Sequence, residues 1–160
     1  MAVRDLVERV SRSDRCVVHP PTGMPTIRSE HRLPAGLIDF YQVCGGVNLF
    51  RGAEYEISVV SSTEFLESNL VILGERFSDD ISDSWYTIAA TPDREYVSID
   101  LSVERNGRCY DSFHEVHGIM GSSPIVAASF TELLENLLNG QGSYWYWLRP
   151  DFSSPGDAYD

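Results

Sequence analysis

The sequence predicts an α+β fold in which a central, mostly antiparallel sheet is flanked by helices. One segment alternates apolar and polar residues with the period of a strand and is followed by a turn dipeptide. Amphipathic segments with helix-capping residues lie before and after this strand in the chain. The chain has 160 residues, of which 42% are apolar, so it can bury a continuous core and is not expected to be disordered. We therefore expect a single domain that spans residues 1–160.

The clearest strand lies just before residue 104. Its apolar residues, which alternate with polar ones, are Val97, Ile99, Leu101 and Val103. This period of two is typical of a strand with one buried face. Asn106-Gly107 follows and favours a type I′ turn, and residues 108–111 then return as the partner strand. The pattern predicts a β-hairpin.

Shorter segments are expected to complete the sheet. They are rich in β-branched or aromatic residues and are bounded by turn residues. The segments are residues 47–50, 55–59, 85–90 and 124–128. The run Tyr144-Trp145-Tyr146-Trp147 suits an edge strand with both faces partly buried, within an aromatic and polar C-terminal extension at residues 141–160.

Three helices are expected from apolar residues at helical spacing. Residues 3–10 place apolar side chains at i, i+3, i+4 and i+7. The second helix opens near Pro34 and is expected to end at Gly45-Gly46. The third opens with Ser129 and Glu132 in a capping box and is expected to end at Asn139-Gly140.

A fourth helix is expected between residues 62 and 74. Ser61-Ser62-Thr63-Glu64 forms another capping box, and Gly74 marks the end of the segment. Leu66, Leu70 and Leu73 would line one side of this helix. Residues 70–73 could equally form a buried strand, because short apolar runs do not separate the two structures.

Charge is the most informative part of the composition. The chain carries 24 acidic and 12 basic residues, for a net charge of −12. Residues 1–53 hold seven Arg and five acids, a net of +2, whereas residues 54–160 hold five Arg and 19 acids, a net of −14. Such a surface repels nucleic acid and anionic membranes and attracts a basic partner, although solubility alone would also explain it.

The candidate partner-binding residues combine this charge with the C-terminal aromatics, since Tyr and Trp are common anchor residues at interfaces. The acidic candidates are Glu54, Glu56, Asp79, Asp80, Asp83, Asp93 and Glu95, and the aromatic candidates are Tyr144, Trp145 and Trp147. A basic patch of the kind that single-stranded nucleic acid requires does not accompany these aromatics.

Possible metal or catalytic motifs do not match known spacings. The aspartates at 79, 80 and 83 lack the glycine and terminal glutamate of a calcium-binding EF-hand loop. His114 and His117 stand at i and i+3, whereas zinc proteases need i and i+4 on a helix. A metal-dependent enzyme built on these histidines, Glu115 and Asp111 is therefore a weaker alternative, and we assign no catalytic, cofactor or metal residue.

The remaining signals indicate a cytoplasmic protein. Cys16, Cys44 and Cys109 have no paired spacing and are expected to be free thiols in a reducing cytosol. Met1 leads into a charged amphipathic segment, so no signal peptide is expected. No apolar stretch approaches the roughly 20 residues that a membrane span needs.

Three ordered motifs resemble the SUKH superfamily of bacterial toxin-immunity proteins and fungal cell-wall assembly regulators, across roughly residues 30–140. The first is Leu33-Pro34 with Phe40-Tyr41, ending at Gly45-Gly46. The second is the hairpin Val97-Ser98-Ile99-Asp100-Leu101 with Asn106-Gly107-Arg108 and Tyr110-Asp111. The third is Val126-Ala127-Ala128-Ser129-Phe130 with Leu133-Leu134. Residues 141–160 lie outside the resemblance.

The resemblance implies a non-enzymatic immunity protein that binds and blocks a cognate toxin domain. The acidic balance favours a basic toxin, such as a nuclease whose nucleic-acid site would be masked. We expect a monomer or weak dimer that binds neither nucleic acid nor membrane and needs no cofactor. The alternative is a regulatory or scaffold module that is not linked to a toxin.

Overall fold

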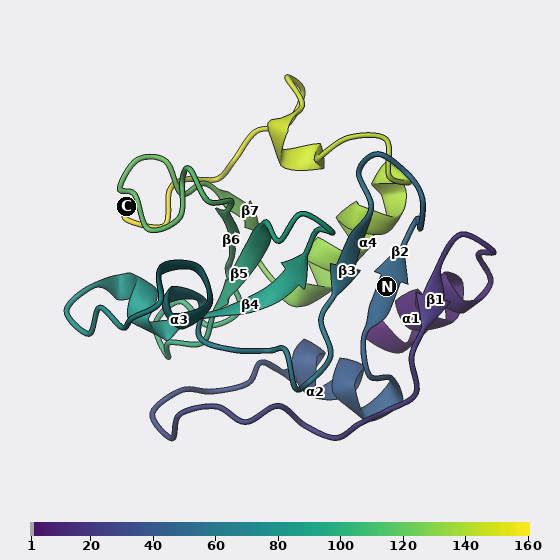
Figure 1. The fold of residues 1–160 in the computed structure, drawn as a ribbon, viewed down its shortest axis with the longest axis horizontal. Coiled ribbons are helices and arrows are strands. Elements are labelled where there is room, and N and C mark those ends of the chain that lie inside the picture. The colour runs from purple at the N-terminus through teal and green to yellow at the C-terminus, as the bar shows by residue number, and fades with distance from the viewer. Residues whose placement is uncertain (1) are drawn as a thin grey trace.

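The computed structural model describes residues 2–160 and shows a seven-stranded antiparallel sheet with four α-helices in that range (Figure 1). The strands are β1 (Val17–Val18), β2 (Val47–Leu49), β3 (Ile57–Val59), β4 (Trp85–Ala90), β5 (Tyr96–Asp100), β6 (Cys109–Ser112) and β7 (Ile125–Ala127). The helices are α1 (Val3–Ser11), α2 (Ala35–Val43), α3 (Ser68–Leu73) and α4 (Phe130–Gly140). The predicted α+β class with a central antiparallel sheet is confirmed.

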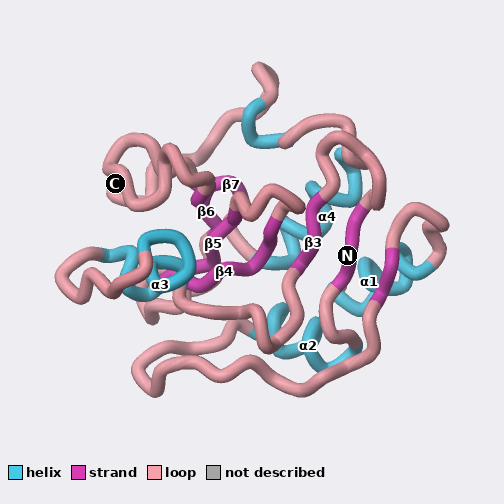
Figure 2. The backbone as a smooth tube through the Cα atoms, in the orientation of Figure 1, coloured by secondary structure: helices cyan, strands magenta, loops and turns pink. Residues whose placement is uncertain are grey.

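The sheet is a meander, because its strand order follows the chain order from β1 to β7. Long loops join many of the elements, and the longest runs from β1 to α2 along one side of the molecule (Figure 2). The pairing puts one row of residues on the same face of the sheet: Asn48, Ser58, Ala90, Tyr96 and Ser112. This row defines the polar face of the sheet.

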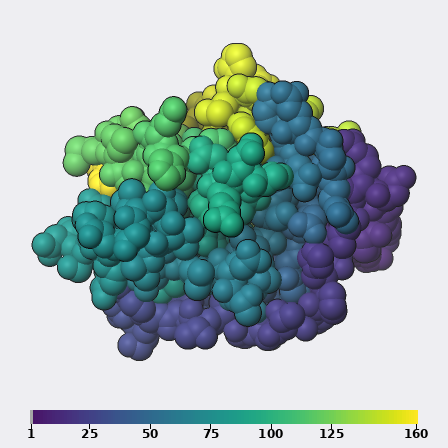
Figure 3. Space-filling model, viewed as in Figure 1, coloured from purple at the N-terminus to yellow at the C-terminus, as the bar shows by residue number. Residues whose placement is uncertain are grey.

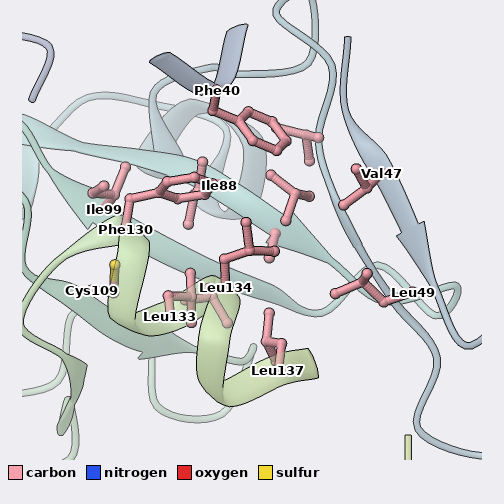
Figure 4. Close-up of a cluster of buried hydrophobic side chains, with 14 of the residues drawn as sticks. Phe40, Val47, Leu49, Ile88, Ile99, Cys109, Phe130, Leu133, Leu134 and Leu137 are labelled. Atoms are coloured by element: carbon pink, nitrogen blue, oxygen red, sulfur yellow. The ribbon is translucent and has the colours of Figure 1, made fainter. Parts of the chain in front are cut away.

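The opposite, apolar face carries the main core. Helices α1, α2 and α4 contact one another against this face, and Figure 4 shows Phe40 of α2 and Leu134 of α4 directed at the strands. Helix α4 begins as predicted, since the Ser129 side chain accepts a hydrogen bond from the Glu132 backbone N–H. The apolar positions Val97 and Ile99 of the predicted strand lie in this core, as expected from their period of two.

Only part of the polar face is covered. Over β4 to β6 it is buried by α3, by the loop at residues 113–123 and by the C-terminal residues, where Trp85, Tyr110, Ile125 and Ala158 form a second apolar cluster. Over β2 and β3 the described structure has no such cover, and a groove lies there instead. Among residues 2–160, no helix has the length and apolar character of a membrane span.

The predicted two-residue hairpin turn is wrong. Strand β5 ends at Asp100 and β6 begins at Cys109, so eight residues connect them, and Val103 is 63% exposed instead of buried. The buried Asp100 carboxylate explains the early end, because it accepts hydrogen bonds from the Ser84 hydroxyl, the Tyr110 hydroxyl and the Arg105 guanidinium. These polar contacts turn the chain away from the strand direction.

Two other local predictions also need correction. The helix expected from residue 62 begins only at Ser68, and Leu66, Leu70 and Leu73 are exposed, whereas Ser68 and Asn69 are buried. The aromatic run 144–147 forms no strand, since its second half lies in a 3₁₀ helix, Tyr146–Leu148. In both places, partners distant in the sequence decide the conformation.

Helix α2 ends at Val43, but Gly45 does not supply the left-handed residue of a glycine stop, because Cys44 is already extended. Gly45 instead allows a close backbone approach, because a Cβ there would lie 2.2 Å from the Pro20 carbonyl oxygen. Gly46 takes the positive φ of 109°. The glycine pair therefore joins the 19–22 segment to the start of β2.

Candidate partner-binding surface

Six of the ten predicted partner-binding residues lie at one end of the sheet. Glu54 and Glu56 precede β3, and Asp93 and Glu95 lie in the connection between β4 and β5. The C-terminal segment reaches the same end, and Figure 3 shows it in yellow against the blue β2–β3 connection. These residues come from three segments of the chain that the sheet brings side by side.

Tyr55 joins the acidic and aromatic groups. Its ring centroid lies 4.9 Å from that of Tyr144 and 5.1 Å from that of Trp145. Trp145 also contacts Phe113 at 5.6 Å, and the neighbouring His114 backbone N–H donates to Glu95 Oε1 at 3.0 Å. We call the resulting surface the acidic-aromatic surface. It consists of Glu54, Tyr55, Glu56, Asp93, Glu95, Tyr144 and Trp145.

The four carboxylates of this surface are available to a partner. Within residues 2–160, none of them takes part in an ion pair. Glu54 and Asp93 are exposed, and Tyr144 presents 41% of its surface to solvent. The side chains thus combine unpaired negative charge with accessible aromatic area.

Trp147 does not belong to this surface. It is only 5% exposed, and its indole N–H donates to Asp111 Oδ2 at 3.1 Å. Burial raises the pKa of Asp111, while the hydrogen bonds from the Phe113 backbone and the indole oppose that rise. The ring fastens the C-terminal segment to β6 and leaves little area for a partner.

The acidic loop that contains residues 79, 80 and 83 is largely occupied by contacts within the protein. Asp83 Oδ2 lies 2.9 Å from Arg28 Nη2 and 3.0 Å from Arg76 Nη2, and its side chain is only 13% exposed. Hydrogen bonds from Arg76, followed by those from Arg28, lower the pKa of Asp83 to about 2. Its charge is therefore already neutralised inside the fold.

Asp80 is also committed to internal contacts. Its Oδ2 accepts hydrogen bonds from the Ser82 hydroxyl at 2.5 Å and from the Tyr159 hydroxyl at 2.7 Å. Burial works against ionisation of Asp80, but these donors outweigh it and lower the pKa of the carboxyl. Of the three aspartates in the loop, only Asp79 is exposed without such partners among the described residues.

A buried polar network contains an arrangement that sequence reasoning did not find. The Ser112 hydroxyl lies 2.9 Å from His117 Nδ1, and His117 Nε2 lies 2.7 Å from Asn69 Oδ1. Ser112, His117 and Asn69 stand in the order of a nucleophile, a base and an amide that orients the base. However, these three side chains are only 0%, 5% and 3% exposed, so no substrate reaches them.

The histidines of the weaker enzyme hypothesis are separated by the fold. Burial lowers the pKa of His117 to about 4, so its imidazole is neutral, whereas His114 and Glu115 are exposed. Within residues 2–160, no group of three His, Cys, Asp or Glu side chains is placed to hold a metal ion. The network instead connects α3 to the loop that follows β6.

The open groove over β2 and β3 was also missed. It has a volume of about 690 Å³, and its lining includes His19, Asn48, Ser58, Glu56 and Glu64. Its floor is held by hydrogen bonds, from Asn48 Nδ2 to Ser58 Oγ at 2.5 Å and between His19 Nε2 and Asn48 Oδ1 at 2.6 Å. The sequence signal that could have revealed this groove is the polar residue in the middle of β2 and of β3, because such residues indicate a sheet face without apolar cover.

Comparison with known proteins agrees with this architecture and with the resemblance noted in the sequence. The chain belongs to the SMI1/KNR4 family (SUKH-1), whose family model matches residues 28–136. It is similar to a protein named "Immunity protein YokJ" from Bacillus subtilis (strain 168), with 41% identity over 160 residues. That alignment covers 100% of this chain and 97% of the relative.

Proposed function

We propose that this protein is a non-enzymatic immunity protein that binds a cognate toxin domain and blocks it. The observation that carries the proposal is the full-length similarity to a protein named as an immunity protein. The family membership supports it as well. The proposed mechanism is occlusion of the toxin's active site by the bound immunity protein.

The acidic-aromatic surface is the proposed contact site. Its four unpaired carboxylates accelerate the approach of a basic partner and orient it, while Tyr144 and Trp145 supply apolar contact area. A toxin that acts on nucleic acid has a basic active site, which such a surface matches in charge. We therefore propose a basic toxin, with a nuclease as the favoured class, bound in the cytoplasm by a monomer or weak dimer of this protein.

The experiment measures binding between this protein and the toxin domain that the adjacent gene encodes. The test variant carries Glu54→Gln, Glu56→Gln, Asp93→Asn and Glu95→Gln. The matched control removes the same charge from exposed acids elsewhere and carries Asp5→Asn, Asp14→Asn, Asp39→Asn and Glu104→Gln.

The proposal expects the test variant to lose affinity by about 1–3 kcal/mol, because rim charge pairs contribute several tenths of a kcal/mol each. The control variant should bind like the wild type. Equal losses in both variants would mean that only net charge matters, and a wild-type protein that neither binds nor neutralises the toxin would overturn the function.

A further inference from the structure

We infer that the open groove over β2 and β3 receives an extended segment of the toxin that carries at least one Arg or Lys side chain. The inference rests on the proposed function and identifies a second, concave part of the contact. It is carried by the shape of the groove, by the charge of its lining and by its continuity with the acidic-aromatic surface.

The groove is an uncovered part of the sheet's polar face. Asn48, Ser58 and Ala90 belong to one cross-strand row and form its floor. The segments at residues 19–22 and 60–64 line its sides. The volume of about 690 Å³ lies within the roughly 300–1,000 Å³ range of small-molecule binding pockets, so the groove can hold a short piece of a partner.

The lining favours a cation. Glu56 and Glu64 both line the groove, and neither takes part in an ion pair within residues 2–160. Each has one oxygen engaged: Glu56 Oε1 accepts from the Gly52 N–H at 2.9 Å, and Glu64 Oε1 accepts from the Ser61 hydroxyl at 3.3 Å. Among the described residues, the second oxygen of each carboxylate has no such donor and can accept a hydrogen bond from a guanidinium or ammonium.

The rest of the lining suits the body of a long cationic side chain. Ala90 and Pro92 offer apolar surface for its methylene groups. The Ser58 and Thr63 hydroxyls offer hydrogen bonds to a partner backbone. Among the described lining residues there is no arginine, the chain has no lysine, and the His19 imidazole is hydrogen-bonded to Asn48. A phosphate group would therefore meet two carboxylates without an Arg or Lys to offset them.

An extended segment fits the direction of the groove. Glu56 immediately precedes β3, and the chain from Ser58 to Ser61 follows the groove toward Glu64. At about 3.3 Å per residue, the stretch from Glu56 to Ser61 spans roughly 16 Å, the length of about five extended residues. Glu56 also belongs to the acidic-aromatic surface, so one partner can occupy both sites without a gap.

The test uses two variants that affect the groove in different ways. Glu64→Gln removes a charge that belongs to the groove but not to the acidic-aromatic surface. Ser58→Trp fills the floor without changing the charge. Their controls are Asp39→Asn, an exposed acid on α2, and Ser122→Trp, an exposed serine outside the groove. Circular dichroism and thermal unfolding establish that each variant is folded.

Binding of the toxin domain from the adjacent gene is measured at 50 and 300 mM NaCl. We expect Glu64→Gln to weaken binding about threefold to tenfold at low salt, with a smaller effect at high salt. Ser58→Trp should weaken it about tenfold or more at both salt concentrations, because the bulky ring occupies the space of the segment. Both controls should bind like the wild type.

The outcomes separate the two proposals. A wild-type protein that does not bind the toxin overturns the proposed function and this inference with it. If the wild-type protein binds and both groove variants bind equally well, the groove inference alone is overturned.

The groove inference is also overturned if Glu64→Gln loses affinity while a folded Ser58→Trp binds fully, since the charge would then act outside the groove. If Ser58→Trp does not fold, a Glu64→Gln variant that binds as tightly as Asp39→Asn overturns the inference, and a loss confined to Glu64→Gln supports it.

Discussion

The buried His117 predicts that mild acid destabilises this protein. Its Nε2 lies against Asn69 Oδ1, which only accepts, so Nε2 carries the proton and Nδ1 accepts from the Ser112 hydroxyl. Protonation would place a second N–H against Ser112 and a charge in a buried site. The native state therefore favours the neutral ring.

The size of the effect follows from the shift in pKa. The pKa of His117 falls from 6.5 to about 4 on folding, mainly because the ring is buried. Between these values the unfolded chain binds more protons than the native state, so the free energy of unfolding falls as the pH is lowered. The slope reaches about 1.36 kcal/mol per pH unit between the two pKa values, so the loss between pH 7 and pH 5 is about 2 kcal/mol. The loss is complete below the folded pKa, at about 3 kcal/mol.

Urea unfolding at pH 7.0 and pH 5.0 measures this quantity in the wild type and in His117→Gln. The variant is expected to be less stable at pH 7, but its free energy of unfolding should change less between the two pH values. His31 also has a lowered pKa because of burial, and since it is present in both proteins its contribution cancels in the comparison. Equal losses in both proteins, or an imidazole that titrates near pH 6.5 by NMR, would refute the reasoning.

Two further predictions concern a position of close backbone contact and a hydroxyl that donates to a half-buried carboxylate. Gly45→Ala should destabilise the protein by about 2 kcal/mol or more, because its Cβ would lie 2.2 Å from the Pro20 carbonyl oxygen. The matched change is Gly140→Ala, since an added Cβ at this position in α4 meets nothing within 4 Å and should stabilise the protein by about 0.5–1 kcal/mol. Denaturant unfolding that ranks the two variants in the opposite order would contradict this reasoning. Tyr159→Phe should lower stability by about 1–2 kcal/mol in thermal unfolding, since Asp80 loses a donor at 2.7 Å. An unchanged melting temperature would show that the C-terminal residues are not held by this contact.

Local sequence patterns correctly predicted those helices and strands in which the spacing of apolar residues along the chain matches the side that is buried. Helix α4 has a serine cap and five buried residues at helical spacing, and both features can be read from adjacent residues. Strands β3, β4 and β7 likewise fall within the segments that their residue types indicated. In such elements, propensity, capping and core direction agree, and the long-range structure has no reason to change them.

Helix α3 shows where local patterns are insufficient. Its leucines at 66, 70 and 73 were expected to be buried, yet Ser68 and Asn69 occupy the buried side. Ser68 Oγ lies 2.7 Å from Ser98 Oγ, and Asn69 contacts His117. These partners lie 30 and 48 residues away in the sequence, so no local period can identify them.

The sequence by itself determined the fold class, the family and the excess of negative charge, because each of these depends on composition and on short ordered motifs. Only the tertiary structure decided which charges are free. Asp83 is neutralised by Arg28 and Arg76, which are 55 and 7 residues away, whereas Glu54 and Asp93 remain exposed and unpaired among the described residues. The physical reason is that the Coulomb energy and the desolvation of a carboxylate depend on distances in space, which the meander sets by placing remote segments side by side.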